Sequence, residues 1–475
     1  MAREMTDTIS GKTSLDWADF AAKLAPVETI SDPVLVKKRS RDFFWYSPIL
    51  NQQLRRAFGD LVAVPKTREE LAHCLKVAHA QDAPIVLRGG GTGNYGQAVP
   101  LDGGLIIETT AMNRIIEIGE GYVTAEAGAK MLDINKALQE RGWEMAIFPS
   151  TQDIATIGGF VGGGSSGIGS VSEGMLRTPG NIVSLKAMSV EEDPKEHLFE
   201  GEDANHIHHA WGMNGVITEV TLRTVPHRDW MHCMTTFDSY RDAYAAGYEL
   251  AKAANIARKL VSTQDARICA YYPRLKGHIR EDKHLLVSLV PKEDMEAFRA
   301  LMVAQGGHVD LAMTHAELKQ AGIPQVYEFA YNHTTLQVLK ADRSATYLQI
   351  GCPTPPDPDR VNALRPLLGN DVWMHHEYAK SGGEIVTFDL PIVWFSTEDR
   401  LHEIETIYRE NGFPVFDAHT CMVEGGGLKN TDYRHLAWKK RMDPKGLLNS
   451  AKSREWKNVA HLSPEAIEAL IPEQN

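Results

Sequence analysis

Two glycine-rich segments stand out in this sequence of 475 residues. Residues 91–96 read GTGNYG and residues 162–167 read GGGSSG, so both fit the pattern GxGxxG. Glycine lets backbone N–H groups approach a phosphate closely, and successive N–H groups can form an anion-binding nest. The two segments therefore predict loops that bind an anionic group through the backbone.

The residues after each glycine segment argue against a Rossmann dinucleotide site. That site needs a helix that begins inside the glycines, so that its positive end faces the pyrophosphate. The first segment runs into residues 97–104, QAVPLDGG, where Pro100 would interrupt a helix. The second runs into residues 168–174, IGSVSEG, which is equally unfavourable. We therefore predict two loops without helices.

Residues 373–378 of the second half, WMHHEY, could supply acid–base chemistry. In a strand, side chains alternate between two faces, so His375 shares a face with Glu377 and His376 shares one with Tyr378. Histidine, glutamate and tyrosine can all transfer protons in catalysis. The alternative is a polar strand at a solvent-facing edge.

Residues 416–427, FDAHTCMVEGGG, form a second such segment. If it is a strand, Asp417, His419 and Cys421 share a face. The alternatives are a histidine satisfied by its neighbours and a glutamate satisfied by the N–H groups of the glycines that follow it. From the two segments we select His419, Glu424, His375 and Tyr378 as candidate catalytic residues.

The elements that must position these residues differ between the two halves of the chain. In the first half, short strands and helices alternate around the glycine segments; a helix follows Pro65, with Thr67 and Glu70 as a capping box. We expect strands at 85–87, 105–107 and 123–127 and a second helix near 131–141.

After Pro226, strand–helix–strand units replace the glycine segments. We predict two ferredoxin-like units that form an antiparallel sheet covered by helices, although no sequence repeat marks a duplication. The first comprises 231–237, a helix at 240–254, and 267–272; the second comprises 373–378, 385–395, a helix at 398–409, and 413–423.

Four segments in order carry a resemblance to a known family, and a fifth matches more weakly. The four are Val64-Pro65 before a helix, PIVLRGGGTGNYG from Pro84, residues 148–169 and residues 211–226; the weaker match is residues 442–452. Together they resemble the vanillyl-alcohol oxidase and p-cresol methylhydroxylase (PCMH-type) flavoproteins, in the branch of glycolate oxidase and D-lactate dehydrogenase. The resemblance implies an FAD cofactor.

The implied fold class is α+β: a PCMH-type FAD-binding domain of two α/β subdomains and an antiparallel-sheet substrate (cap) domain with ferredoxin-like units. We expect an N-terminal extension at 1–54, the FAD-binding domain at 55–227, the cap domain at 228–425, and a C-terminal segment that returns to the FAD domain at 426–475.

The resemblance also implies which residues contact FAD. The first loop would wrap the pyrophosphate, the second would lie along the other side of the cofactor, and the segment after Gly215 would lie near the adenine. The implied residues are Arg88, Gly89, Gly90, Gly91, Thr92, Gly93, Asn94, Tyr95, Gly96, Ser150, Thr156, Ile157, Gly158, Gly159, Gly163, Ser165, Ser166, Gly167, Ile168, Gly169 and Ile217.

Departures from the family's patterns refine this expectation. Some members bind flavin covalently through a histidine that would fall at Thr92, or through a cysteine that would fall near Thr151 or Gln152, so we predict non-covalent FAD. The branch's Glu-His-Gly-Ile-Gly signature is degenerate at Glu424, and its metal-binding GDGNxH stretch has no counterpart. We therefore predict no metal and doubt a simple D-2-hydroxy acid as substrate.

The sequence His206-Ile-His208-His209 could suggest a metal site. It lacks a nearby pattern of acidic or cysteine partners, so we interpret it as a solvated loop.

Composition limits the partners. The net charge of −12 would repel nucleic acid, and no apolar run is long enough to span a membrane. The five cysteines contain no CxxC pair, which suggests a reduced cytoplasmic protein. The expected partners are a small-molecule substrate, an electron acceptor that is oxygen, a quinone or an electron-transfer protein, and a second copy in a homodimer.

The sequence thus predicts an FAD-dependent oxidoreductase. A dehydrogenase or oxidase would take two electrons from a CH–OH or benzylic C–H donor, with flavin N5 as hydride acceptor. The alternative is a redox-neutral flavin-dependent transferase of the alkylglycerone-phosphate synthase type. Storage of flavin is a third hypothesis, which leaves the large second half without a purpose.

Overall fold

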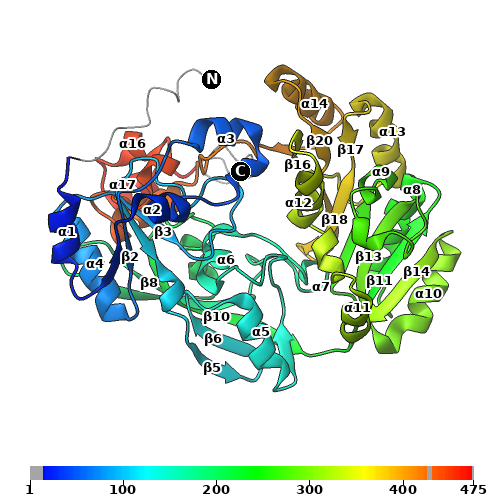
Figure 1. Ribbon diagram of the computed structural model, residues 1–475, viewed down its shortest axis with the longest axis horizontal. Coiled ribbons are helices and arrows are strands. Elements are labelled where there is room, and N and C mark those ends of the chain that lie inside the picture. Colours follow the sequence, from blue (N-terminus) through cyan, green and yellow to red (C-terminus); the bar gives the residue numbers. More distant parts are fainter. Residues whose placement is uncertain (1–13, 425–430, 473–475) are drawn as a thin grey trace.

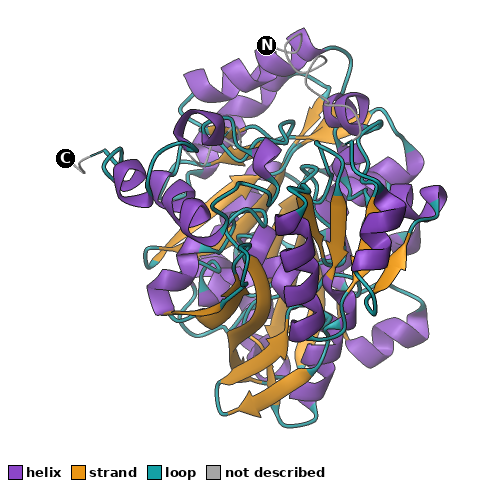
Figure 2. Cartoon of the chain, turned by 90° about the vertical axis from the view of Figure 1, so that its left-hand side faces the viewer, coloured by secondary structure: helices purple, strands orange, loops and turns teal. Residues whose placement is uncertain are grey.

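A computed structural model describes residues 14–424 and 431–472. Its two halves lie side by side in Figure 1, where the blue, cyan and first green elements together with the red helices form one half, and the later green, yellow and brown elements form the other. Figure 2 shows helices packed around the strands when the molecule is turned by 90°. The predicted boundary between residues 425 and 426 lies outside the described residues.

The first sheet carries the first glycine loop. Strands β2 (Leu61–Val64), β4 (Leu105–Glu108) and β3 (Ile85–Arg88) are parallel, and β1 (Glu28–Ile30) pairs antiparallel with β2. Helix α4 (Arg68–Ala80) links β2 to β3, and Thr67 caps it by accepting the N–H of Glu70. Since β3 ends at Arg88, the glycine loop begins where this buried strand stops.

The second sheet carries the other side of this half. Its strand order is β5-β6-β10-β8-β9, and β7 pairs with the far end of β10. The bounds are β5 Ile115–Gly119, β6 Tyr122–Glu126, β7 Trp143–Met145, β8 Ile182–Met188, β9 Glu196–Glu200 and β10 Val216–Pro226, with α5 at Met131–Gln139.

The prediction that the second glycine segment lacks a helix is wrong. Helix α6 (Ile157–Gly163) precedes the loop, and Thr156 caps it by accepting the N–H of Gly159. Buried Ile157, Phe160 and Val161 have helical spacing and fix the short helix against the core, which offsets the low helix propensity of glycine. A second short helix, α7 (Ser170–Glu173), follows the loop.

Besides a three-stranded sheet of β15 (Ala345–Tyr347), β20 (Ile392–Trp394) and β17 (Val372–Trp373), the second half contains a sheet of eight strands in the order β14-β11-β13-β12-β18-β19-β16-β21. Each set of four has ferredoxin-like connections, and β12 joins the sets by pairing antiparallel with β18, which confirms the predicted architecture. The first unit is β11 Trp230–Phe237, α8 Tyr240–Lys252, β12 Leu260–Gln264, β13 His284–Pro291, α10 Met295–Ala304 and β14 His308–Thr314. The second is β16 Gln349–Gly351, α13 Pro358–Leu368, β18 His375–Ser381, β19 Glu384–Asp389, α14 Glu398–Glu410 and β21 Val415–Phe416.

Two predicted strands of this half are wrong. Residues 266–269 form helix α9 (Ala266–Cys269), which Asp265 caps, and the strand of that unit is β12 instead. The predicted strand at 413–423 shortens to β21, because Asp417 accepts the N–H of His419 and the chain turns away from the sheet. Asp417, His419 and Cys421 therefore do not share a strand face.

The ends of the described chain pack on the first half. Ile85 of β3 donates its N–H to Leu447 and accepts the N–H of Asn449, so the C-terminal segment covers the edge of the first sheet. The elements here are α1 Trp17–Lys23, α2 Pro33–Arg39, α3 Pro48–Leu54, α15 Tyr433–Met442, α16 Trp456–Val459 and α17 Pro464–Glu468. Within the described residues, every helix is too short or too polar to cross a bilayer.

Candidate functional site

A cavity of about 610 Å³ lies between the two halves. Its walls come from both glycine segments, from the segment before β10, and from the strands and loops of the eight-stranded sheet. Cofactor and ligand sites commonly have volumes of about 300–1,000 Å³ and form where domains meet. The size and position of the cavity are therefore those of a ligand site.

Glycines of the first loop are required by its close packing. A Cβ on Gly90 would overlap the backbone carbonyl of Ile154, and Gly91 has a φ of +65°. A left-handed backbone is unfavourable for residues other than glycine. The loop can therefore follow this path, beside residues 154–156, only with glycine at both positions.

The same loop presents unused backbone donors. In the part of the chain that the structure describes, no group accepts a hydrogen bond from the N–H groups of residues 90–96. Glu and Asp side chains do not supply the missing acceptors, since Asp42 accepts from Phe44 and Ala98 instead. Consecutive N–H groups of this kind suit the oxygens of a bound phosphate.

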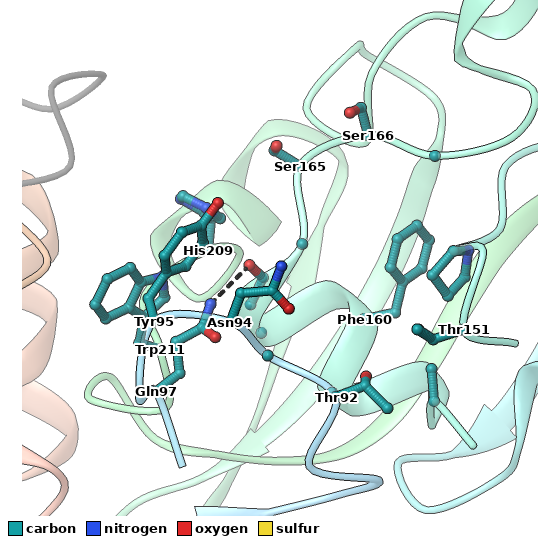
Figure 3. Close-up of a pocket in the computed structure, with 18 of the residues that line it drawn as sticks. Thr92, Asn94, Tyr95, Gln97, Thr151, Phe160, Ser165, Ser166, His209 and Trp211 are labelled. Carbon is teal, nitrogen blue, oxygen red and sulfur yellow. Dashed lines mark hydrogen bonds between the residues drawn. The ribbon is translucent and has the colours of Figure 1, made fainter. Parts of the chain in front are cut away.

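Gln97 links the two glycine segments. Its Nε2 donates to the carbonyl oxygen of Gly163 over 3.3 Å, the dashed line in Figure 3. Beside it, the rings of Tyr95 and Trp211 stack with centroids 5.9 Å apart. Figure 3 places Thr92 of the first loop near Thr151 and Phe160, with Ser165 and Ser166 on the second loop. The two loops therefore share one continuous wall.

Two charged side chains, Arg88 and Asp42, line the cavity behind the first loop. Arg88 donates to the carbonyl oxygens of Arg39 and Arg41, which fixes its guanidinium next to the glycines. Burial raises the pKa of Asp42 from 3.8 to about 6, although the N–H of Ala98 and the nearby Lys452 oppose this shift. The N-terminal segment thus contributes to this wall, which its position in the sequence did not indicate.

Most residues that the resemblance assigned to FAD line the cavity. They are Arg88, Gly89, Gly90, Gly91, Thr92, Gly93, Asn94, Tyr95, Ser150, Thr156, Gly158, Gly159, Gly163, Ser165, Ser166, Gly167 and Ile217. The structure places Gly96, Ile157, Ile168 and Gly169 outside this lining. The free N–H groups and the glycine-dependent path of the first loop fit the pyrophosphate of FAD.

The cap wall centres on Glu377 of β18 and Tyr331, which both line the cavity. Oε1 of Glu377 accepts the N–H of Tyr331 at 2.6 Å and the hydroxyl of Ser262 at 2.8 Å. The hydroxyl of Tyr331 in turn donates to the carbonyl oxygen of Gly167 at 2.7 Å. Tyr331 therefore connects the cap to the second glycine segment.

The four candidate catalytic residues lie in the described chain, and none of them lines the cavity. His419 is buried, and its Nδ1 lies 2.8 Å from the hydroxyl of Ser47. Burial lowers the pKa of His419 from 6.5 to about 4, so the imidazole is neutral at pH 7. This environment differs from the strand face that we expected for it.

The other three candidates have partners within the protein. His375 faces Glu377, with Nε2 2.7 Å from Oε1, as the predicted alternation requires. Tyr378 points to the opposite face and donates to the carbonyl oxygen of Tyr244. Glu424 accepts hydrogen bonds from Ser453 and from the N–H of Arg454; the glycines that follow it lie outside the described residues.

The histidines at 206–209 do not form the solvated loop that we predicted. His208 is buried with Nε2 3.0 Å from the carbonyl oxygen of Gly164, and His209 lines the cavity. His209 and Trp211 both have positive φ, a tight backbone that brings their side chains to the cavity wall. Among the described residues, no cluster of three or more His, Cys, Asp or Glu side chains could hold a metal ion.

Comparison with known families identifies the class of the first half. Residues 59–192 match the family model of the FAD binding domain, and they include β2, both glycine segments and part of the second sheet. The chain therefore carries an FAD-binding domain of the PCMH type.

Curated relatives match part of the chain. The chain is 30% identical to glycolate oxidase subunit GlcD of Bacillus subtilis over 36% of its own length and 38% of the relative. It is 24% identical to D-lactate dehydrogenase of Archaeoglobus fulgidus over 50% of its length and 53% of the relative. The matches thus span about two fifths to half of the length of these proteins.

Solved structures resemble nearly the whole fold. An alkyldihydroxyacetonephosphate synthase superposes with a TM-score of 0.69 and 13% identity, over 93% of this chain and 86% of that one. A Physcomitrella patens BBE-like 1 variant gives 0.64 and 11%, over 90% and 97%. Both likenesses therefore extend over the two halves of the fold and not over the FAD-binding region alone.

Proposed function

We propose that this protein is an FAD-dependent oxidoreductase that removes two electrons from a CH–OH or benzylic C–H donor. The supporting observation is that one cavity has the first glycine loop on one wall and the cap sheet, with its buried polar side chains, on the other. When bound, FAD supplies the hydride acceptor. The protein's own residues bind its pyrophosphate, shield the reacting atoms from water and orient the donor.

An anaerobic reduction experiment tests this proposal. The purified holoprotein should lose its visible flavin absorbance when mixed with a donor from a panel of alcohols, phenols, hydroxy acids and sugars. The redox-neutral transferase differs, because it would exchange groups between two substrates without any external acceptor. Turnover under nitrogen with fully oxidised flavin at the end would therefore contradict the oxidoreductase.

We propose that FAD is held without a covalent bond. Thr92 and Thr151, which line the cavity at the family's attachment positions, carry hydroxyl groups, and Gln152 donates its amide to the hydroxyl of Tyr327. Acid precipitation of the yellow protein should therefore leave the flavin in the supernatant. Flavin that remains with the washed precipitate would show a covalent link.

The proposal extends to the electron acceptor and to assembly. We propose a homodimer in the cytoplasm that passes its electrons to oxygen, a quinone or an electron-transfer protein. Reoxidation of the reduced flavin by air, by a soluble quinone and by a protein acceptor should differ in rate and so identify the acceptor class. Light scattering at several concentrations measures the subunit number.

A further inference from the structure

Glu377 is held in one orientation by three contacts to a single oxygen. Ser262, which lies opposite it on β12, donates its hydroxyl to Oε1 at 2.8 Å. His375 Nε2 lies 2.7 Å from the same oxygen, and the N–H of Tyr331 donates to it at 2.6 Å. The residue is only 2% exposed, so water does not compete for these contacts.

The second oxygen of this carboxylate is different. Oε2 of Glu377 is buried and has no hydrogen-bond partner among the described residues, although the residue lines the cavity. A buried carboxylate oxygen without a donor is costly, and such groups in native proteins call for an explanation. A hydroxyl group of a bound ligand would supply the missing donor.

Tyr331 shows that the chain is strained to build this arrangement. Its φ of 50° and ψ of −142° lie far from the conformations that a tyrosine prefers, so the backbone is strained here. The strained backbone is what presents the N–H to Glu377, while the ring lines the cavity and the hydroxyl reaches Gly167. The strained residue therefore lies where the cap and the FAD-binding domain meet.

The charges of the cap wall limit the donor that fits. Among the described residues of the cap half that line the cavity, Glu377 and Asp417 are the charged ones, and both are acidic. Val386, Phe388, Leu390 and Phe416 add apolar surface. A substrate carboxylate would meet like charge at this wall, because the arginines that line the cavity, Arg88 and Arg177, belong to the FAD-binding half. An uncharged alcohol would find apolar surface and acceptors such as Oε2 of Glu377.

We propose that Glu377 is the proton acceptor of the reaction and that its substrate is an uncharged, partly apolar alcohol. This inference rests on the proposed oxidoreductase function. The O–H bond of the alcohol breaks as its proton passes to Oε2, and the C–H bond breaks as its electron pair and hydrogen pass to FAD. The products are the carbonyl compound, protonated Glu377 and reduced flavin. Ser262, His375 and the N–H of Tyr331 act as positioning groups.

The first test compares Glu377→Gln with Glu384→Gln in the holoprotein. Benzyl alcohol, glycolate and D-lactate serve as donors in anaerobic flavin reduction. The wild type should be reduced by benzyl alcohol in preference to the two acids. Glu377→Gln should slow this step by about 10²–10⁴-fold, the usual contribution of a general base. Glu384→Gln, which removes an exposed carboxylate of β19 outside the cavity, should remain within about threefold of wild type.

A second measurement does not depend on the substrate. Sulfite is an anionic nucleophile that adds to oxidised flavin and bleaches its colour, so a carboxylate near the flavin ring weakens its binding. Glu377→Gln should bind sulfite at least about tenfold more tightly than the wild type, and Glu384→Gln should bind it equally, with FAD content unchanged in both.

The outcomes separate this inference from the function on which it rests. Unchanged sulfite affinity in Glu377→Gln, or flavin reduction at the wild-type rate, would overturn the role of Glu377. Preference for glycolate or D-lactate would overturn the substrate class. If no donor reduces the wild type while sulfite binding still tightens in Glu377→Gln, the oxidoreductase proposal fails and the carboxylate is placed beside the flavin.

Discussion

At Gly91 the backbone has a φ of +65°, and a Cβ there would overlap the guanidinium of Arg88. Because the loop faces the cavity, neither feature is expected to determine the overall stability of the domain. Both concern the path that brings the N–H groups of residues 90–96 to the predicted pyrophosphate. A substitution at this one residue can therefore separate loss of the cofactor from loss of the fold.

We predict that Gly91→Ala loses most of its bound FAD while the protein remains folded. The strain of about 1–2 kcal/mol and the displaced Arg88 should distort the loop. The flavin-to-protein absorbance ratio after gel filtration and the far-UV circular dichroism measure the two effects. The control is Gly142→Ala, with a similar φ of +77° and open space around the new Cβ. Full flavin content in Gly91→Ala would show that the loop does not depend on this glycine.

At the scale of elements, strand β19 carries a buried acid whose ionisation opposes folding. Asp389 accepts hydrogen bonds from the N–H of His375 and from the hydroxyl of Tyr408, on the face of the sheet covered by helices. Burial raises its pKa from 3.8 to about 7, and these two donors only partly offset the effect. The acid is therefore protonated in the folded protein at pH 5 but ionised in the unfolded chain.

This difference predicts a dependence of stability on pH. Between pH 4 and 7 the folded state holds a proton that the unfolded chain releases, so stability contributed by Asp389 falls as pH rises through that window, by up to about 1.4 kcal/mol per pH unit. Asp389→Asn should remove this loss. Urea unfolding at pH 5, 6, 7 and 8 should show the variant gaining on the wild type as pH increases.

Asp265, the cap of α9, provides a control of opposite sign. Burial alone would raise the pKa of Asp265, but its hydrogen bonds to Arg267 and the charges of Arg267 and Arg365 lower it to about 2. The stability that Asp265 contributes is therefore fully present above the pKa that aspartate has in the unfolded chain. Asp265→Asn should cost the same stability at every pH from 5 to 8. A difference between Asp389→Asn and wild type that stays constant over this range would contradict the raised pKa of Asp389.

At the scale of the whole molecule, a buried ion pair joins the two halves. Lys259, which precedes β12, lies 2.5 Å from Glu144 of β7, and it also donates to the carbonyl oxygen of Met145. Trp230 and His227 contact the same carboxylate, so Glu144 is the centre of a network between the FAD-binding domain and the cap. Both charged side chains are almost completely buried.

We predict that Lys259→Met destabilises the protein by about 3–5 kcal/mol, because it leaves the Glu144 carboxylate buried without its cation. Differential scanning calorimetry should show a lower Tm and separate transitions for the two halves. The control is Lys252→Met, which breaks an exposed pair with Glu249 and should change stability by less than about 1 kcal/mol. An unchanged, single transition in Lys259→Met would contradict this role.

Local signals in the sequence determined much of the fold. Glycine spacing located both loops, the Thr67 cap located α4, and alternation placed His375 and Glu377 on one face of β18, because each of these patterns depends on neighbours a few residues away. The order of strands and helices in the second half was sufficient to indicate two ferredoxin-like units.

Tertiary structure decided the rest of the site. Asp417 ends β21 by a turn that the apolar pattern does not reveal, and this removes His419 from the sheet. Glu377 became prominent only when β12 supplied Ser262, the loop before α12 (Asn332–Ala341) supplied the N–H of Tyr331, and the cavity reached the same point. These groups are separated by up to 115 residues in the sequence. Contacts over such distances leave no periodic signal along the chain, because they are set by how the sheets pack and not by the spacing of neighbouring residues.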